Sequence, residues 1–311
     1  MNSESVLQAY INRIKQNNIE PNKIGTIKAC YLNKNGYAVL KSLEPVNAGN
    51  AGYFRVRYRN FDKIRAFNNL LIQSGVPTSK IYVCKYFEND YYELQERVVG
   101  RPLYKYNSEQ ICKDALNINC DLNELSKQQL LNVSDYVFNY NLQTIKMLNQ
   151  APQEHFDALL KGIMVMANFG IREFDNNGEN ILYSPKTGFK LVDLDIEEFI
   201  KDYVKNKKQP LTEQEKFDCA TGSFAEIFEN CLYFADPVYM LDCPLFNEKQ
   251  ISELHNQNVD ISKKIYTAIK NNGYSLHDKD YASYVLKSIV GEQNFNLDFG
   301  KVISKTEGRK K

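Results

Sequence analysis

Three side chains whose oxygen atoms could act as ligands lie near the middle of the chain. Their spacing would allow them to belong to one site. Asp175 is followed five residues later by Asn180, and Asp193 stands after two short apolar runs. Those two runs flank a segment of turn-forming residues, Ser184 to Gly188. The pattern predicts an antiparallel hairpin, which would bring Asn180 and Asp193 opposite each other to within one residue.

Carboxylate and amide oxygens suit Mg²⁺ or Mn²⁺, especially when phosphate oxygens complete the shell. Transfer of a phosphoryl group needs one acid beside the acceptor hydroxyl and oxygen ligands that hold metal on the nucleotide. Asp175 is the candidate acid, and Asn180 and Asp193 are the candidate metal ligands. Asp195 is a further candidate ligand, or else a solvated turn acid. A surface hairpin with polar ends is the alternative interpretation of the whole pattern, since Asp and Asn also favour turns.

Helices and strands must position these residues. The apolar spacing of Gln153 to Asn168 predicts a helix that leads directly into the Asp175 segment. A second helix is expected at Phe61 to Gln73. Five β-like runs are expected upstream of residue 99, at 23–27, 29–32, 37–40, 80–85 and 91–98.

In order and spacing, these features resemble the active site of protein kinases. The D-x-x-x-x-N motif of that family corresponds to the run from Asp175 to Asn180, and its D-F-G motif to the run from Asp193 to Asp195. The lysine of the family's V-A-I-K strand corresponds to Lys41, which ends the run that begins at residue 37.

The resemblance implies that ATP is the phosphoryl donor, with Mg²⁺ or Mn²⁺ as the metal. Lys41 would then hold the α- and β-phosphates. The backbone around Glu96 and Val98, in the place of the kinase hinge, would hydrogen-bond adenine. Gly25 is the one glycine that remains of the three in the phosphate-covering loop. The predicted metal ligands are Asn180, Asp193 and Asp195.

The resemblance also sets the expected fold. The predicted fold class is α+β: a bilobal protein-kinase-like fold with a small five-stranded antiparallel N-lobe and a helical C-lobe. The expected divisions of the chain are an N-terminal helix (1–18), the N-lobe and hinge (19–103), a helical insertion (104–150), the catalytic core of the C-lobe (151–200), and a divergent helical region with a basic tail (201–311).

Several family features are replaced. Glu173 and Phe174 stand where the family has His-Arg. The helix at 61–73 contains Asp62 in place of the family's glutamate, so the ion pair with the strand lysine would be Lys41–Asp62, with a shorter acidic side chain. No activation segment is visible, and residues 201–209 read as a lysine-rich linker.

This set of departures is similar to the short kinases that bacterial pathogens inject into host cells. The resemblance implies a kinase that acts on a protein Ser/Thr hydroxyl in the host cytoplasm, reached by a non-classical secretion route. Two alternatives stay open: a pseudokinase that binds a partner without transfer, and a phosphotransferase for a small molecule, as in aminoglycoside- and choline-type kinases.

A basic group precedes and enters the helix at 61–73. Its members are Arg55, Arg57, Arg59, Lys63 and Arg65. Arginine forks suit phosphate oxygens, so these cations are a candidate docking site for an anionic host activator, such as an inositol polyphosphate, a phosphoinositide or an acidic protein face. A solvated basic edge strand that guards against aggregation is the alternative.

The composition excludes several classes of function. Lys+Arg of 39 against Asp+Glu of 38 gives no bulk attraction for nucleic acid. Seven cysteines without a C-x-x-C pair and three scattered histidines predict reduced thiols in a reducing compartment. No apolar run reaches the ~20 residues of a membrane helix, so we expect a soluble, cytoplasmic-type protein. The sequence does not indicate an oligomeric state or a particular acceptor.

Overall fold

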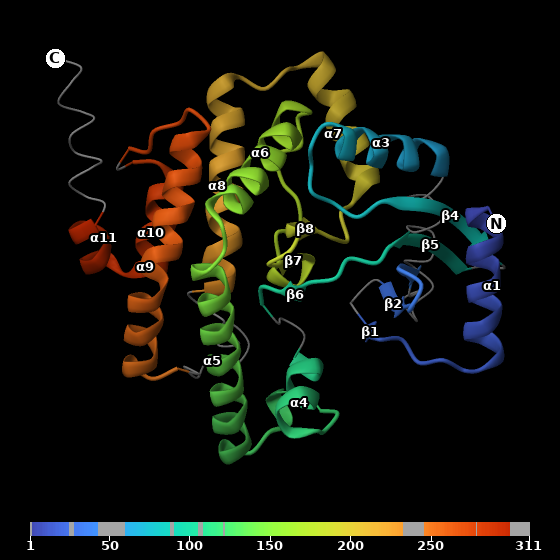
Figure 1. The fold of residues 1–311 in the computed structure, drawn as a ribbon, viewed down its shortest axis with the longest axis horizontal. Coiled ribbons are helices and arrows are strands. Elements are labelled where there is room, and N and C mark those ends of the chain that lie inside the picture. The colour runs from blue at the N-terminus through green and yellow to red at the C-terminus, as the bar shows by residue number, and fades with distance from the viewer. Residues whose placement is uncertain are drawn as a thin grey trace.

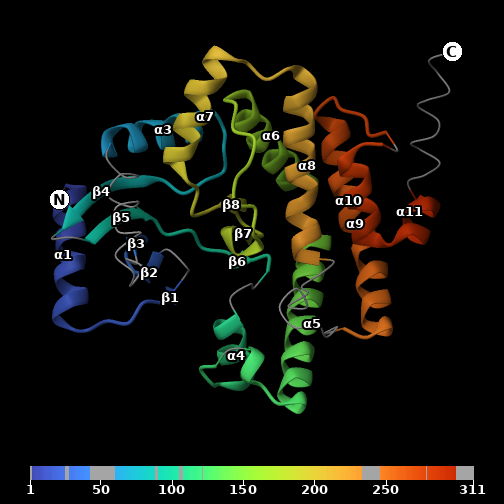
Figure 2. The same ribbon diagram turned by 180° about the vertical axis from the view of Figure 1, so that it is seen from behind.

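The structure is a computed structural model, and it describes residues 2–24, 28–42, 60–87, 90–104, 108–120, 122–232, 246–277 and 279–298. It has the predicted mixed α+β character. Figure 1 shows a sheet at one end of the molecule, a group of long helices at the other, and a second, small sheet between them. Figure 2 shows the same order from behind.

The first sheet has five antiparallel strands in the order β1-β2-β3-β5-β4. The strands are β1 (Lys23–Ile24), β2 (Lys28–Leu32), β3 (Tyr37–Ser42), β4 (Ile81–Phe87) and β5 (Asp90–Glu96). The expected run at 23–27 is a strand over two residues only, and the other four runs are strands close to the expected bounds.

A helix packs on each face of this sheet. On one face, Val39, Tyr92 and Leu94 form a core with Leu7 and Ile11 of α1 (Ser3–Gln16). On the other face, α3 (Phe61–Gln73) packs against β4 and β5, and the ring of its first residue lies 5.6 Å from that of Tyr91, between centroids. Because side chains alternate along a strand, each sheet residue belongs to either the α1 face or the α3 face.

The second sheet has three antiparallel strands, β6 (Arg101–Pro102), β7 (Ile181–Ser184) and β8 (Gly188–Leu191), in that order. The hairpin predicted around Ser184 to Gly188 is therefore confirmed. The chain leaves the first sheet through residues 97–100 and joins the second at β6. A Cβ on Gly100 would lie 3.1 Å from the Tyr183 carbonyl oxygen, so this passage runs close against β7.

Helices form the rest of the described chain. They are α4 (Ser108–Leu116), the 3₁₀ turn η1 (Leu122–Glu124), α5 (Lys127–Asn149), α6 (Gln153–Asn168), the 3₁₀ turn η2 (Gly178–Asn180), α7 (Ile196–Lys208), α8 (Glu213–Leu232), α9 (Glu248–Asn271), α10 (Tyr281–Val290) and α11 (Glu292–Asp298). Capping boxes begin α5 at Ser126 and α9 at Asn247. In the part of the chain that the structure describes, none of these helices has both the length and the apolar surface needed to cross a bilayer.

One expectation about this half was wrong. The lysine-rich segment 201–209 is not a linker, because residues 201–208 belong to α7; its lysines line the solvent side, while Ile196 and Phe199 are buried. The α9 helix runs without interruption from Glu248 to Asn271. Its polar residue Asn258 is buried, and the side chain donates to the Ile289 carbonyl of α10.

Candidate functional site

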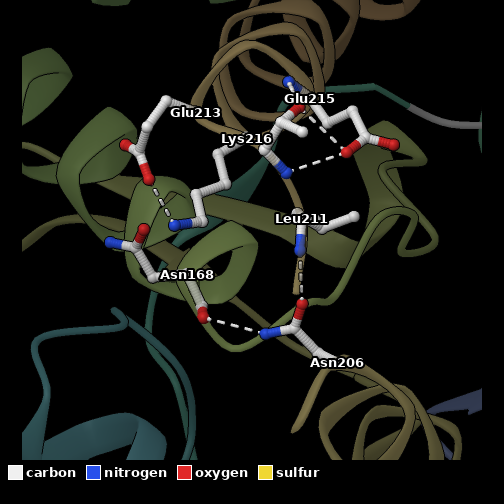
Figure 3. A network of polar contacts seen from close by, with 7 residues as sticks. Asn168, Asn206, Leu211, Glu213, Glu215 and Lys216 are labelled. Carbon is white, nitrogen blue, oxygen red and sulfur yellow. Dashed lines mark hydrogen bonds and ion pairs between the residues drawn. The ribbon is translucent and has the colours of Figure 1, made fainter. Parts of the chain in front are cut away.

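The end of α6 leads the chain into the Asp175 segment. Gly170 ends this helix with φ +87°, a conformation that side chains strongly disfavour, and Ile171 is buried directly after it. A Cβ at Gly170 would lie 2.2 Å from the Cβ of Asn206 in α7, so only glycine fits here. Asn206 also donates to the Asn168 carbonyl at 3.4 Å and accepts from the Leu211 amide at 2.9 Å (Figure 3). The α6 terminus is thus fixed by the α7–α8 connection.

Asp175 and Asn180 are in direct contact. The Asn180 amide nitrogen donates to Asp175 Oδ2 at 2.8 Å, and the Asn177 backbone donates to Asp175 Oδ1 at 3.2 Å. Asp175 remains exposed to solvent, and Asn180 is partly buried. The loop thereby holds an ionisable carboxylate at the surface with both oxygens oriented by hydrogen bonds.

The hairpin places Asp193 beside this pair. Its register pairs Ile181 with Leu191, and the Val192 amide donates to the Asn180 carbonyl at 2.8 Å. Asn180 therefore lies opposite Val192, and Asp193 is the next residue, within the one-residue margin expected from the sequence. Asp193 is exposed and has φ +57°, a left-handed conformation that Asp tolerates better than most residues.

A segment between α3 and β4 fixes the β8 strand that carries Asp193. Leu191 donates its amide to the Pro77 carbonyl at 2.7 Å, and its carbonyl accepts from the Thr78 hydroxyl at 2.9 Å and the Ser79 amide at 3.3 Å. Pro77 in turn lies against Gly162 of α6, where an added Cβ would be 2.3 Å from the proline ring. The sequence offered no signal for this contact, because the partners lie 113 residues apart.

The donor set fits a divalent cation that also binds phosphate oxygens. Because Asn180 faces Asp175 with its amide nitrogen, its amide oxygen lies on the other branch of the side chain. Asp193 supplies a carboxylate one residue beyond the strand pair. Among the described residues, no three His, Cys, Asp or Glu side chains gather into a complete metal site. A metal held by these residues would therefore need further oxygen ligands from a nucleotide.

Asp195 has a structural role. It is the N-cap of α7, where its side chain accepts a hydrogen bond from the Glu198 amide at 3.3 Å. Its proposed contact with metal stays a prediction.

Lys41 lies on the α1 face of the first sheet. It pairs directly with Tyr92 in register and shares its face with Val39, and both of these residues belong to the core beneath α1. Its ammonium group forms a 2.9 Å ion pair with Asp90, not the pair with Asp62 that the sequence suggested. The structure therefore brings Asp175, Asn180 and Asp193 together but leaves Lys41 on the face opposite α3. Its role as phosphate anchor stays a prediction.

The hinge residues connect the two sheets. The Glu96 amide donates to the Lys80 carbonyl at 2.8 Å, and its carboxylate accepts from the Lys80 amide at 3.3 Å, so Glu96 is engaged within the first sheet. Val98 is half-buried in the passage between β5 and β6. Gly25 lies outside the described residues. A nucleotide contact at any of these three residues stays a prediction.

A buried polar network lies on the α3 face and was not expected from the sequence. Glu93 is 4% exposed; it accepts from the Tyr91 hydroxyl and, at 2.6 Å, from the Gln95 amide. Gln95 accepts in turn from the Ser79 hydroxyl at 3.1 Å. Burial, and then the charge of Glu93, raises the pKa of Tyr91 well above its usual value, so Tyr91 stays a hydrogen-bond donor. The alternation of β5 could have predicted the shared face, but not the burial of a carboxylate there.

Aromatic side chains pack α3 against α6 and α7. Phe67 of α3, Phe169 at the end of α6 and Tyr203 of α7 have ring centroids 5.4 to 6.0 Å apart. Since α7 begins directly after Asp195, this trio connects α3 to both the Asp175 loop and the Asp193 segment.

The basic group is only partly described. Lys63 is exposed, and Arg65 forms an ion pair with Asp62 at 2.5 Å and donates to the Tyr82 carbonyl at 3.4 Å. Arg55, Arg57 and Arg59 lie outside the described residues. An anion site formed by all five stays a prediction.

Among solved structures, those similar to this chain include kinase domains. The chain is similar to the kinase domain of Mycobacterium tuberculosis PknI, with 11% identity and a TM-score of 0.34 over 86% of this chain and 94% of that one. It is also similar to the Helicobacter pylori proinflammatory kinase CtkA, with 12% identity and a TM-score of 0.26 over 90% and 96% of the two chains. No family model and no curated protein sequence matches this chain. At these low identities and TM-scores, the likeness does not indicate a function for this chain.

Proposed function

We propose that this protein is a kinase-like phosphotransferase that moves the γ-phosphoryl group of ATP to a hydroxyl of a protein acceptor. The observation that carries the proposal is the convergence of Asp175, Asn180 and Asp193 at the open end of the β7–β8 hairpin. The action on Ser/Thr in a host cell rests on the sequence resemblance to injected bacterial kinases.

Each residue has a distinct part. Asp175 accepts the hydrogen bond of the acceptor hydroxyl and orients it, or removes its proton, since its carboxylate is exposed and held by two donors. Asn180 and Asp193 would hold Mg²⁺ or Mn²⁺ together with nucleotide oxygens. When bound, the metal would neutralise charge that develops on the phosphates. Asp195 would act indirectly, by starting α7 beside the ligands.

The test is transfer of label from γ-labelled ATP to protein acceptors in a host lysate, with Mg²⁺ or Mn²⁺. We expect Asp175→Asn to lower turnover by about a hundredfold or more while ATP affinity changes little, because general bases contribute factors of this size. Glu154→Gln is the matched control, because it removes an exposed carboxylate from α6 away from the loop. Wild-type turnover in Asp175→Asn would contradict the proposal.

The position of Lys41 favours a second candidate, a kinase-like domain that binds a partner without transfer. An ion pair with Asp90 on the α1 face leaves no lysine assigned to the phosphates in the described part of β3. We expect Lys41→Ala and Asp90→Asn to behave alike, each lowering the thermal midpoint slightly, since exposed ion pairs contribute about 0–1 kcal/mol. ATP affinity, measured by calorimetry, separates the roles. A loss of ATP binding in Lys41→Ala alone would restore Lys41 as the phosphate anchor.

A further inference from the structure

Two helices of the C-terminal half expose a strip of aromatic and acidic side chains. On α8, Gly222, Glu226 and Glu229 follow one another at helical spacing and face α10. On α10, Tyr281 and Tyr284 are 52% and 64% exposed, and their rings stack with centroids 6.3 Å apart. We call Glu226, Glu229, Tyr281 and Tyr284 the tyrosine–glutamate strip.

Contacts at both ends fix the strip. At one end, the Tyr281 ring lies over Gly222, where an added Cβ would be 3.1 Å from a ring carbon. At the other end, Glu229 lies beside Ser288, whose hydroxyl donates to the Tyr284 carbonyl at 3.3 Å. The two contacts are seven residues apart on both helices, so α8 and α10 run in the same direction here. Seven residues of helix span about 10 Å, which is longer than a single ammonium group.

Two carboxylates give the strip negative charge. Glu226 and Glu229 are both partly buried, and neither forms an ion pair with a lysine or arginine among the described residues. Burial, and then the charge of Glu226, raises the pKa of Glu229. The same two carboxylates contribute to the raised pKa of Tyr281, after burial. Partly buried carboxylates of this kind are stabilised when a cation pairs with them.

The strip adjoins the proposed catalytic loop. The Asn176 amide, one residue after Asp175, donates to Glu226 Oε2 at 2.9 Å. The 3₁₀ turn η2, which ends at Asn180, also packs against α8. A group bound along the strip is therefore held next to the carboxylate that would serve the acceptor hydroxyl.

We propose that the tyrosine–glutamate strip binds a basic segment of the polypeptide acceptor, with Lys or Arg side chains near the hydroxyl. Carboxylates pair with these cations, and tyrosine faces attract them through their ring electrons. An extended chain advances about 3.3 Å per residue, so about three residues would cover the strip. The inference rests on the proposed function and adds the class of acceptor to it.

The test measures binding without ATP, so its result does not depend on phosphoryl transfer. The probe is a fluorescein-labelled serine peptide flanked by arginines, and its match carries glutamates in place of the arginines. By fluorescence anisotropy, we expect the arginine peptide to bind at least about tenfold more tightly, with an advantage that shrinks at high salt. Equal affinity of the two peptides would overturn the proposal.

Substitutions of residues in the strip test whether the peptide binds there. We expect Tyr284→Ala and Glu229→Gln each to weaken binding of the arginine peptide severalfold, and Glu229→Lys to shift preference toward the glutamate peptide. Glu213→Gln is the control, because Glu213 lies on the same helix outside the strip and is exposed. If Glu229→Lys fails to fold by circular dichroism, Tyr284→Ala decides, since that side chain is mostly solvated. Arginine-peptide affinity unchanged in Tyr284→Ala and Glu229→Gln would overturn the proposal.

A third measurement separates a peptide from a small cation. Tetramethylammonium, added as competitor, should displace the arginine peptide only at concentrations far above those of unlabelled peptide. Displacement at equal concentrations would show a site for a single ammonium group and would overturn the polypeptide assignment. If the peptide binds as expected but no label is ever transferred from ATP, the proposed function fails while the strip stands as a docking site.

Discussion

At the scale of single residues, Asn180 contacts two neighbouring segments, one through its side chain and the other through its backbone. The side-chain amide nitrogen of Asn180 donates to Asp175, and its backbone carbonyl accepts from the Val192 amide in the hairpin. Asp193 then follows in a conformation that few side chains tolerate. The positions of all three residues are therefore fixed mostly by backbone geometry, which is why substitutions here should alter chemistry more than packing.

We expect Asp193→Asn to abolish most phosphoryl transfer while leaving the thermal midpoint nearly unchanged. Asparagine also tolerates φ near +57°, so this change removes the charge and keeps the backbone. Asp193→Ala is the contrasting variant, because alanine adds strain of about 1–2 kcal/mol at a left-handed position. Turnover of each variant with Mg²⁺ and Mn²⁺ is the measurement. Full activity in Asp193→Asn would remove Asp193 from the metal site.

At the scale of elements, local sequence signals predicted the parts that local signals control. The β7–β8 hairpin, α6 and α3 appeared at the expected places because turn residues and apolar spacing define them. The sequence predicted a linker over most of α7, because its many lysines made the short apolar face of the helix hard to recognise. The contact of Thr78 with Leu191 could not be predicted, since it joins distant segments.

The helix end at Gly170 gives a prediction at this scale. We expect Gly170→Ala to destabilise the protein clearly more than Gly273→Ala. The two glycines have nearly equal φ angles, +87° and +86°, so backbone strain costs each about 1–2 kcal/mol. Only Gly170 faces a neighbour: an added Cβ there meets Asn206 at 2.2 Å, whereas Gly273 has nothing within 4 Å. Urea denaturation of both variants measures the difference, and equal losses would show that Asn206 moves aside without cost.

At the scale of the whole molecule, two sets of side-chain and backbone contacts, in addition to the chain itself at residues 97–100, couple the five-stranded sheet to the helical half. One is formed by the segment from Pro77 to Ser79, which is hydrogen-bonded to Leu191 of β8. The other is the aromatic trio of Phe67, Phe169 and Tyr203 (α3 and α7 in Figure 1). From the resemblance to protein kinases, the sequence predicted that Asp62 stands on α3 in place of the family's glutamate and that an anionic activator docks beside this helix. The docking of an anion stays a prediction. Phe169 and Tyr203 of the trio pack against α3 from within the chain.

This coupling gives the last prediction. We expect Tyr203→Ala to loosen α3 and to lower phosphoryl transfer, because the ring joins α3 to the helix that follows Asp193 and Asp195. Tyr203→Phe should behave like the wild type, since the packing belongs to the ring; the cation of Lys207 also lies over that ring, 4.4 Å from its centroid. Hydrogen exchange of the α3 amides measures the loosening, because exchange reports local opening. Faster exchange in α3 with slower transfer is the expected pair of results for Tyr203→Ala. Unchanged exchange in α3 would mean that the segment from Pro77 to Ser79 is sufficient to keep α3 in place.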